Sequence, residues 1–396
     1  MANGVRLHVV STQQSLAPSS HPARTARLPA IDLLRGLAVI GMILVAYAGD
    51  WEHRFTILTH ADWRGFALAD MIFPTFLFCV GAALPFSFGR RAAGGKAALA
   101  ANVVRRSVAL IALGIFLNLL PAFDFGSVRL MGILQRIGLC YLLVGLWCIA
   151  AGRRTEAGFR IPLGAVLGAT GAVVAGYGAL LLAWDAPGCG PACFDSAHSL
   201  PTVVDRALFG VHHLWPYGMT NGQVTYEPEG LVSTLGALIN VLAGTATTLA
   251  LQRRRDVKTF AALAVAGVLC LAAGQLLDPL IPVVKKIWTP SFALLSTGFS
   301  LLLFLLLMRV RAGWTFVMVF GTNATLAFIG ISLLDTLMQL PLLGGPRASL
   351  HDAAAHLLGQ AIPEARIASA TYSVLLLLLL AFLLWQLYRR RIFFKL

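Results

Sequence analysis

Charged side chains are scarce in this sequence. Asp, Glu, Lys and Arg make up only 12% of its 396 residues, about half their share in a typical soluble protein. Hydrophobic residues make up 58%, and the mean hydropathy is +0.78. The shortage of charge excludes a soluble globular domain, and a lipid bilayer becomes the expected surrounding.

Acidic residues are scarcer than basic ones, with 17 Asp and Glu against 31 Lys and Arg. The net charge of +14 could indicate nucleic-acid binding, but the sequence lacks a basic stripe or a recognised nucleic-acid motif. The basic residues instead form short clusters between apolar runs, as in the cytoplasmic loops of membrane proteins. We therefore expect no nucleic-acid partner.

A cleavable signal peptide and an internal repeat are also missing. Residues 1–28 are rich in Ser, Pro, Ala and Arg and have no apolar core. We expect them to form a disordered cytoplasmic tail, followed by one transmembrane domain over residues 29–396. Many secondary transporters are built from repeats, so the lack of one counts against a transporter.

What the sequence does contain is ten apolar segments, each near the length of about 20 residues that a helix needs to cross a bilayer core. The sequence predicts an all-α polytopic membrane protein with about ten transmembrane helices and two long outer loops, 184–230 and 337–370. The expected spans are 31–48, 66–88, 103–120, 130–150, 161–183, 231–251, 259–280, 291–308, 314–336 and 371–388.

The Lys and Arg residues predict the orientation of these spans. With the N-terminus inside, 21 of them fall in inner segments and 8 in outer segments. Positive charge collects on the cytoplasmic side of membrane proteins. We therefore expect both termini in the cytoplasm and His60 on the outer side.

Only six cysteines occur, and four of them lie in apolar spans. The other two, Cys189 and Cys193, lie close together in the long outer loop, where an oxidising compartment favours a disulfide. The adjacent His212 and His213 are poorly placed to chelate one ion, so we expect no metal site.

The stretch from His60 to Gly81 carries the strongest chemical signal. It places an imidazole at the mouth of an apolar helix and a carboxylate, Asp70, inside that helix, where a charge is costly and marks a functional site by default. His60, flanked by Asp62 and Trp63, is suited to act as a general base or nucleophile. The alternative is an ordinary interfacial histidine.

Polar groups at the outer ends of other spans are candidates for substrate contacts. Asp70 and Arg136 lie at similar depths, roughly 8–9 Å below the outer interface at 1.5 Å per residue. We predict that they pair, either as a structural ion pair or as part of a site that includes Gln135. Glu227 and Glu229 could bind a substrate amine or be ordinary loop acids.

Two further candidates lie near the eighth and ninth spans. Trp288 marks the outer entrance of the eighth, and Asn323 is a polar side chain within the ninth that needs a partner.

Four residues are candidates for contact with a cofactor at the inner side, and three of them are arginines that could form a basic mouth. Arg35, with Arg105 and Arg106, could bind a phosphorylated cytosolic ligand. Asp32 and Arg35 could equally form a self-satisfied helix pair, and the positive-inside rule also accounts for Arg105 and Arg106.

Seven short motifs stand in order between residues 31 and 324: IDLLRG (31–36), HADWRG (60–65), DMIFPTFLFCVG (70–81), LQRI (134–137), YEPEGLVST (226–234), KKIWTPS (285–291) and GTNA (321–324). Together they resemble the heparan-alpha-glucosaminide N-acetyltransferase family, including its bacterial, NagX-like branch.

The resemblance implies the transmembrane acyltransferase fold, here in a bacterial inner membrane, and a homodimer. It implies acetyl-CoA as the cytosolic donor and an amino sugar such as glucosamine as the outer acceptor. The family's active-site histidine matches His60. At Ala46 the family commonly has Asn, and this departure implies a missing auxiliary contact or an altered acceptor.

Two mechanisms fit these residues. His60 could act as the base while the amine attacks the thioester directly, or it could carry the acetyl group transiently. Both need a donor for the developing oxyanion, for which Asn323 is our candidate. A sugar O-acyltransferase of the cell envelope, and a secondary transporter with an Asp70–Arg136 coupling pair, are the alternative functions.

Overall fold

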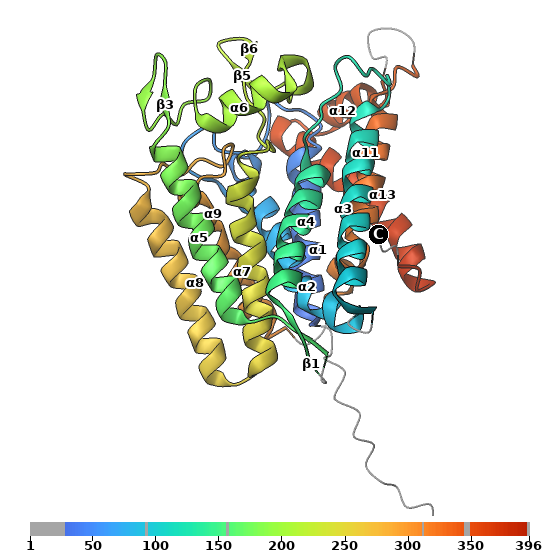
Figure 1. Ribbon diagram of the computed structural model, residues 1–396. Helices are drawn as coiled ribbons and strands as arrows, with labels where there is room; N and C mark the ends of the chain where they lie inside the picture. Colours follow the sequence, from blue (N-terminus) through green and yellow to red (C-terminus); the bar gives the residue numbers. More distant parts are fainter. Residues whose placement is uncertain (1–27, 92–93, 156–157, 311–312, 344–348, 394–396) are drawn as a thin grey trace, which may run out of the picture.

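The computed structural model describes residues 28–91, 94–155, 158–310, 313–343 and 349–393. Long helices run roughly parallel through the molecule, and short helices and hairpins cap its two ends (Figure 1). The tail expected at 1–28 lies outside the described residues, except for Leu28.

Within the described residues, nine helices are long and apolar enough to cross a membrane, and a bent pair gives a tenth span if it is counted as one. This confirms the prediction of an all-α protein with about ten spans. The spans are α1 (Pro29–Ala46), η2 with α2 (Leu68–Met71 and Ile72–Arg91), α3 (Gly95–Leu119), α4 (Ile133–Ala151), α5 (Leu163–Leu182), α7 (Thr234–Arg253), α8 (Val257–Leu277), α9 (Pro290–Leu307), α10 with α11 (Thr315–Thr322 and Ala324–Gln339) and α13 (Ala365–Arg389).

Helix α7 lies at the centre of the bundle and α8 at its edge. The apolar window of α7 is 83% buried and that of α8 only 11%, so α8 presents most of its surface to lipid. Glycines let α7 approach α2 closely, because a Cβ at Gly81 would clash with the carbonyl oxygen of Val241 and one at Gly244 with that of Phe78. Such contacts between small residues drive helix packing in membranes.

The ninth predicted span is broken rather than straight. Helices α10 and α11 meet at an angle of 86°, with Asn323 at the break. Helix α10 packs closely against the first turns of α1, since a Cβ at Gly321 would clash with the carbonyl oxygen of Asp32.

Two ends of the bundle can be told apart in Figure 1. The loop-rich face, at the top, contains both long loops predicted from the sequence. The hairpin face, at the bottom, carries the antiparallel pair β1 (Arg153–Thr155) and β2 (Gly158–Arg160). The short elements of the loop-rich face are η1 (Thr56–Leu58), β3 (Asp185–Ala186), β4 (Gly190–Pro191), α6 (Leu200–Phe209), η4 (Val211–His213), β5 (Met219–Thr220), β6 (Gln223–Val224) and α12 (Leu350–Ala361).

Candidate active site

His60 and Asp70 form a hydrogen-bonded pair on the loop-rich face. Asp70 lies in the 3-10 turn η2, where its Oδ2 accepts hydrogen bonds from the backbone N–H groups of Ala67 (2.8 Å) and Ala61 (3.2 Å). Its Oδ1 lies 2.8 Å from Nδ1 of His60. The side chain of Asp70 is fully buried, whereas that of His60 is 41% exposed. The imidazole is therefore reachable from outside and anchored from below.

A second loop is held against the one that carries His60. The N–H of Gly65 donates to the carbonyl oxygen of Val283 over 2.8 Å, and Gly65 also forms a parallel bridge with Val284. Gly65 has φ +88°, a conformation that a residue with a Cβ rarely adopts. This junction places Lys285 beside His60, although the two are 225 positions apart in the chain.

Lys285 brings a positive charge into the pair. Its Nζ lies 3.2 Å from Asp70 Oδ1 and 3.0 Å from His60 Nδ1. Nδ1 cannot donate to Asp70 and accept from Lys285 at the same time. We assign the proton on Nδ1 to the bond with the carboxylate, because an ionised carboxylate only accepts. Lys285 then forms an ion pair with Asp70, and His60 Nε2 is left as an acceptor.

These contacts favour a neutral imidazole. Partial burial lowers the pKa of His60, and the positive charge of Lys285 lowers it further. The hydrogen bond and the charge of Asp70 oppose both effects. Burial also lowers the pKa of Lys285, against the opposing pull of Asp70 and Glu229. The other ring nitrogen, Nε2, lies 3.4 Å from Lys285 Nζ, and in a neutral imidazole this unprotonated nitrogen can accept a proton near neutral pH.

The predicted pair between Asp70 and Arg136 is wrong. Nη2 of Arg136 donates instead to the carbonyl oxygen of Gly230 (3.1 Å) and to the hydroxyl of Ser233. The guanidinium also lies 4.8 Å from the ring centre of Trp288. Depth alone could not reveal that the η2 turn directs the Asp70 carboxylate toward its own loop.

Trp288, predicted to mark the outer entrance of the eighth span, is buried beside Arg136. It is 1% exposed, its Nε1 donates to Asn240 Oδ1 over 2.9 Å, and Phe73 packs edge-on against it at 5.4 Å.

Glu227 and Glu229, the two candidates for binding a substrate amine, are already paired with Arg129. Arg129 donates from Nε to Glu227 over 2.9 Å and from Nη2 to Glu229 over 2.5 Å. The Glu227 side chain is fully buried. Burial acts to raise the pKa of Glu229, but the charges of Arg129, Arg136 and Lys285 outweigh it and hold that pKa low. These contacts leave Glu227 without access to an amine.

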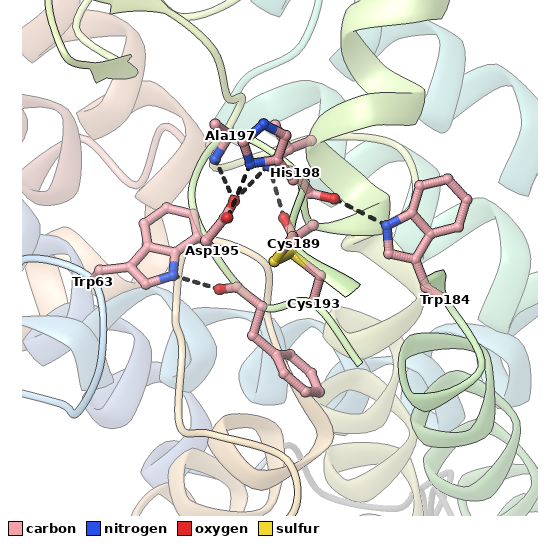
Figure 2. Close-up of a disulfide and its surroundings, with 10 residues drawn as sticks. Trp63, Trp184, Cys189, Cys193, Asp195, Ala197 and His198 are labelled. Carbon is pink, nitrogen blue, oxygen red and sulfur yellow. Dashed lines mark hydrogen bonds and ion pairs between the residues drawn. A yellow bond between two sulfur atoms is a disulfide. The ribbon is translucent and has the colours of Figure 1, made fainter. Parts of the chain in front are cut away.

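Asp62 and Trp63 connect the His60 loop to its neighbours. Lys286 Nζ donates to the carbonyl oxygen of Asp62, and Trp63 Nε1 donates to the carbonyl oxygen of Phe194 over 2.7 Å. Figure 2 shows Trp63 beside the loop that the disulfide closes.

The disulfide predicted between Cys189 and Cys193 is present, with Cα atoms 5.8 Å apart. Next to it, Trp184 Nε1 donates to the carbonyl oxygen of His198 over 2.9 Å (Figure 2). The disulfide and the two tryptophans together order the loop-rich face around the site.

A cavity of about 290 Å³ runs beneath the site. One end is lined by Asp32, Arg35 and Arg106, three of the four residues predicted to contact a cofactor at the inner side. The other end is lined by Ile72 and Phe73, which follow Asp70 directly in the chain. We call this the donor cavity, because it joins a charged end to the region below His60.

The arginines of the mouth differ in their contacts. Arg35 donates from Nη2 to Asp32 (2.5 Å) and from Nε to the carbonyl oxygen of Gly321 (2.7 Å). Arg106 lies 5.2 Å from the ring centre of Tyr141. Arg105 does not line the cavity; it is exposed and donates to Asn102 over 3.3 Å.

Asn323 is far from His60, so the prediction that it serves as an oxyanion donor there is wrong. Its Nδ2 donates to the carbonyl oxygen of Ile392 over 3.2 Å. The neighbouring Gly321 contacts Arg35, which lies 11 positions before the end of α1, or on the order of 15 Å along the helix. Asn323 does not line the donor cavity, although its neighbours Thr322 and Ala324 do. Ala46, where the family commonly has Asn, is the exposed last residue of α1.

Fold and site together define a polytopic membrane protein with an imidazole–carboxylate pair above an internal cavity. Residues 27–185, which contain His60, Asp70 and Arg136, match the family described as heparan-alpha-glucosaminide N-acetyltransferase, catalytic.

Curated relatives agree with that family. The chain is 25% identical to heparan-alpha-glucosaminide N-acetyltransferase of Mus musculus over 365 residues, which cover 80% of this chain and 55% of the mouse protein. It is 26% identical to the Homo sapiens protein of the same name over 353 residues, which cover 77% of this chain and 52% of the human protein. The chain thus spans about half the length of these relatives.

Proposed function

We propose that this protein moves the acetyl group of acetyl-CoA to the amine of an amino sugar at the loop-rich face. One observation carries the proposal: the accessible His60–Asp70 pair directly precedes Ile72 and Phe73 in the chain, and these two residues line a cavity that is also lined by Arg35 and Arg106. The family of residues 27–185 supports the same chemistry.

The donor cavity suits a long ligand with an anionic head. The phosphates of acetyl-CoA would lie at the arginine end, because guanidinium groups bind phosphate oxygens in a bidentate manner. The thioester would lie near Ile72 and Phe73, below His60. Since 21 of the 31 basic residues fall in the predicted inner segments, the hairpin face would be cytoplasmic, with both termini, and His60 would face the outer side of a bacterial inner membrane.

The transfer step uses His60 as the base. The acceptor amine, in its neutral form, attacks the carbonyl carbon of the thioester; a C–N bond forms and the C–S bond breaks. The proton lost by the nitrogen goes to Nε2 of His60, which later returns it to the departing thiolate or to water. Asp70 keeps the other proton on Nδ1, and Lys285 supplies positive charge as the carbonyl oxygen becomes anionic.

The transporter alternative loses its structural basis, because Asp70 and Arg136 have different partners. A transient acetyl-His60 and an O-acyl acceptor would use the same site and stay alternatives. The homodimer stays a prediction.

Transfer of isotope-labelled acetyl groups in detergent-solubilised protein tests the proposal. Wild type, given acetyl-CoA and glucosamine, should form N-acetylglucosamine, and His60→Ala should lose at least about 100-fold in rate. His53→Ala is the matched control, since His53 forms a similar 2.8 Å contact with Asp50 on the same face. Transfer only to an acceptor that bears hydroxyls, or solute flux without use of acetyl-CoA, would overturn the proposal.

A further inference from the structure

Four segments that are far apart in the chain meet at one side chain on the loop-rich face, the indole of Trp63. Its Nε1 donates to the carbonyl oxygen of Phe194 over 2.7 Å. Its ring lies edge-on to that of Tyr226, with ring centres 5.1 Å apart, and Nζ of Lys286 lies 5.9 Å from its ring centre. Trp63 follows His60 by three positions, so these contacts hold the loop that carries the imidazole.

The bond to Phe194 joins the His60 loop to the loop that the disulfide closes (Figure 2). Phe194 directly follows Cys193, and the two residues are only 6% and 3% exposed. The Phe194 side chain belongs to a buried apolar cluster against which Trp63 also packs. The disulfide therefore fixes the place of the Phe194 carbonyl, and Trp63 connects that carbonyl to the His60 loop.

The two cysteines of this disulfide differ in exposure. Cys189 is exposed, whereas Cys193 is buried. A thiolate from solvent can therefore attack the Cys189 sulfur; the S–S bond breaks, and the Cys193 sulfur leaves as a thiolate that takes up a proton. With a dithiol reagent, the second thiol of the reagent then displaces Cys189. The protein gains two thiols, and the reagent is oxidised to a cyclic disulfide.

We propose that Trp63 is a positioning residue for His60 and that the disulfide-closed loop is its support, so that acetyl transfer is slower when the disulfide is reduced. The inference rests on the proposed function and adds a redox control of the same site. In the dithiol form the Phe194 carbonyl is no longer held, and the indole loses its anchor. The His60 loop keeps its other backbone contacts, so the protein stays folded while the imidazole loses its exact placement.

Steady-state kinetics of Trp63→Phe test the role of the indole, because phenylalanine keeps an aromatic ring and removes the Nε1 donor. The variant should lose about 10-fold in kcat and keep its KM for acetyl-CoA within about twofold of wild type. The matched control is Trp184→Phe. Trp184 makes the same kind of bond beside the disulfide, to the carbonyl oxygen of His198 over 2.9 Å (Figure 2), and His198 lies outside the His60 loop.

The control should keep kcat within about twofold of wild type, even where its melting temperature falls as far as that of Trp63→Phe. Equal losses of kcat in the two variants would overturn the inference, because they would mean that only the stability of the loop-rich face matters. An unchanged kcat in Trp63→Phe would overturn it as well.

Reduction and a double-mutant cycle connect Trp63 to the disulfide. Wild type reduced with dithiothreitol, and the double variant Cys189→Ser with Cys193→Ser, should each lose about 10-fold in kcat, and reoxidation should restore the reduced wild type. A chelator is present throughout, because ligand atoms of Cys189, Cys193 and Asp195 lie within 4.8 Å of one another and free thiols there could capture a metal ion. Trp63→Phe should lose no further activity on reduction. A full second loss would overturn the inference, since the disulfide would then act by another route.

Hydrogen exchange separates this inference from the proposed function, because it needs no acetyl transfer. The backbone N–H groups of Ala61 and Gly65 are hydrogen-bonded, so their exchange reports how firmly the His60 loop is held. Reduction should speed exchange in residues 60–67 by about 10-fold in wild type but not in Trp63→Phe. If exchange responds in this way and wild type transfers no acetyl group, the link between disulfide and loop stands and the acetyltransferase proposal fails. If wild type transfers acetyl groups and reduction leaves the exchange unchanged, this inference alone fails.

Discussion

Nδ1 of His60 lies 2.8 Å from Oδ1 of Asp70, and two backbone N–H groups hold the other oxygen of that carboxylate. The backbone therefore fixes the Asp70 carboxylate independently of its contact with His60. An imidazole held in this way keeps its proton on Nδ1 and offers Nε2 to a reacting group.

Asp70→Asn should remove most of the activity while keeping the shape of the side chain. The amide oxygen can still accept from Ala67, but its nitrogen would then donate to His60 and force the ring proton onto Nε2. We expect kcat for acetyl transfer to fall by about 10²–10⁴-fold. Asp185→Asn, at an exposed position of β3, serves as the control for the substitution itself, and a rate within a few-fold of wild type in Asp70→Asn would contradict the role of the pair.

Lys285→Met should shift the pH dependence of kcat/KM. The Lys285 charge lowers the pKa of His60, so its removal raises that pKa and the base form of His60 appears only at higher pH. The acidic limb of the profile should move up by about one pH unit. Lys285→Arg keeps the charge and should leave the limb in place. A limb that moves equally in both variants would mean that the side chain acts through packing.

Arg106 and Arg105 should differ in their effect on the donor. Arg106 lines the donor cavity and Arg105 does not, although the two are adjacent in the chain. Arg106→Met should raise the KM for acetyl-CoA by about 10- to 100-fold, the loss of one charged hydrogen bond. Arg105→Met should leave it unchanged. Equal effects of the two substitutions would show that general positive charge, rather than the cavity, attracts the donor.

Arg129→Met should destabilise the fold in a pH-dependent way. It leaves the fully buried Glu227 without its cation, which costs about 3–5 kcal/mol when the charge stays unpaired. Burial raises the pKa of Glu227 and Arg129 opposes that rise. Without Arg129 the pKa rises further, so the protonated form stabilises the variant at low pH and this gain is lost as pH rises through the folded-state pKa.

Thermal melting at pH 5 and pH 8 checks this expectation. The drop in Tm relative to wild type should be smaller at pH 5 than at pH 8. Arg366→Met, at an exposed position at the start of α13, should melt like wild type at both values. A deficit in Arg129→Met that is the same at pH 5 and pH 8 would argue that Glu227 finds another partner.

The apolar segments were enough to predict the spans, because the length of an apolar segment decides whether a helix can cross a bilayer. The exception is the span that breaks at Asn323. Its sequence carries Asn323 among apolar residues, but the 86° bend there goes with the close packing of α10 on α1 at Gly321, which joins segments far apart in the chain.

The sequence predicted how deep these residues lie in the membrane better than it predicted which side chains they contact. Asp70 and Arg136 lie at similar levels in sequence terms, yet a cap in η2 directs one toward its own loop and Trp288 covers the other. Lys285 entered the sequence analysis only as part of the KKIWTPS motif (285–291). A lysine beside a loop tryptophan is a common pattern at membrane surfaces, and nothing local indicates that it reaches a histidine 225 positions away.

The sequence by itself determined the class of protein, the number of spans and the stretch that carries His60 and Asp70, since these follow from hydrophobicity and from the cost of a charge in a membrane. Only the tertiary structure decided which groups surround that imidazole and where the donor cavity lies. Loop contacts such as Gly65 with Val283, and close helix approaches at glycines, depend on segments that are distant in the chain and meet only when the bundle is assembled.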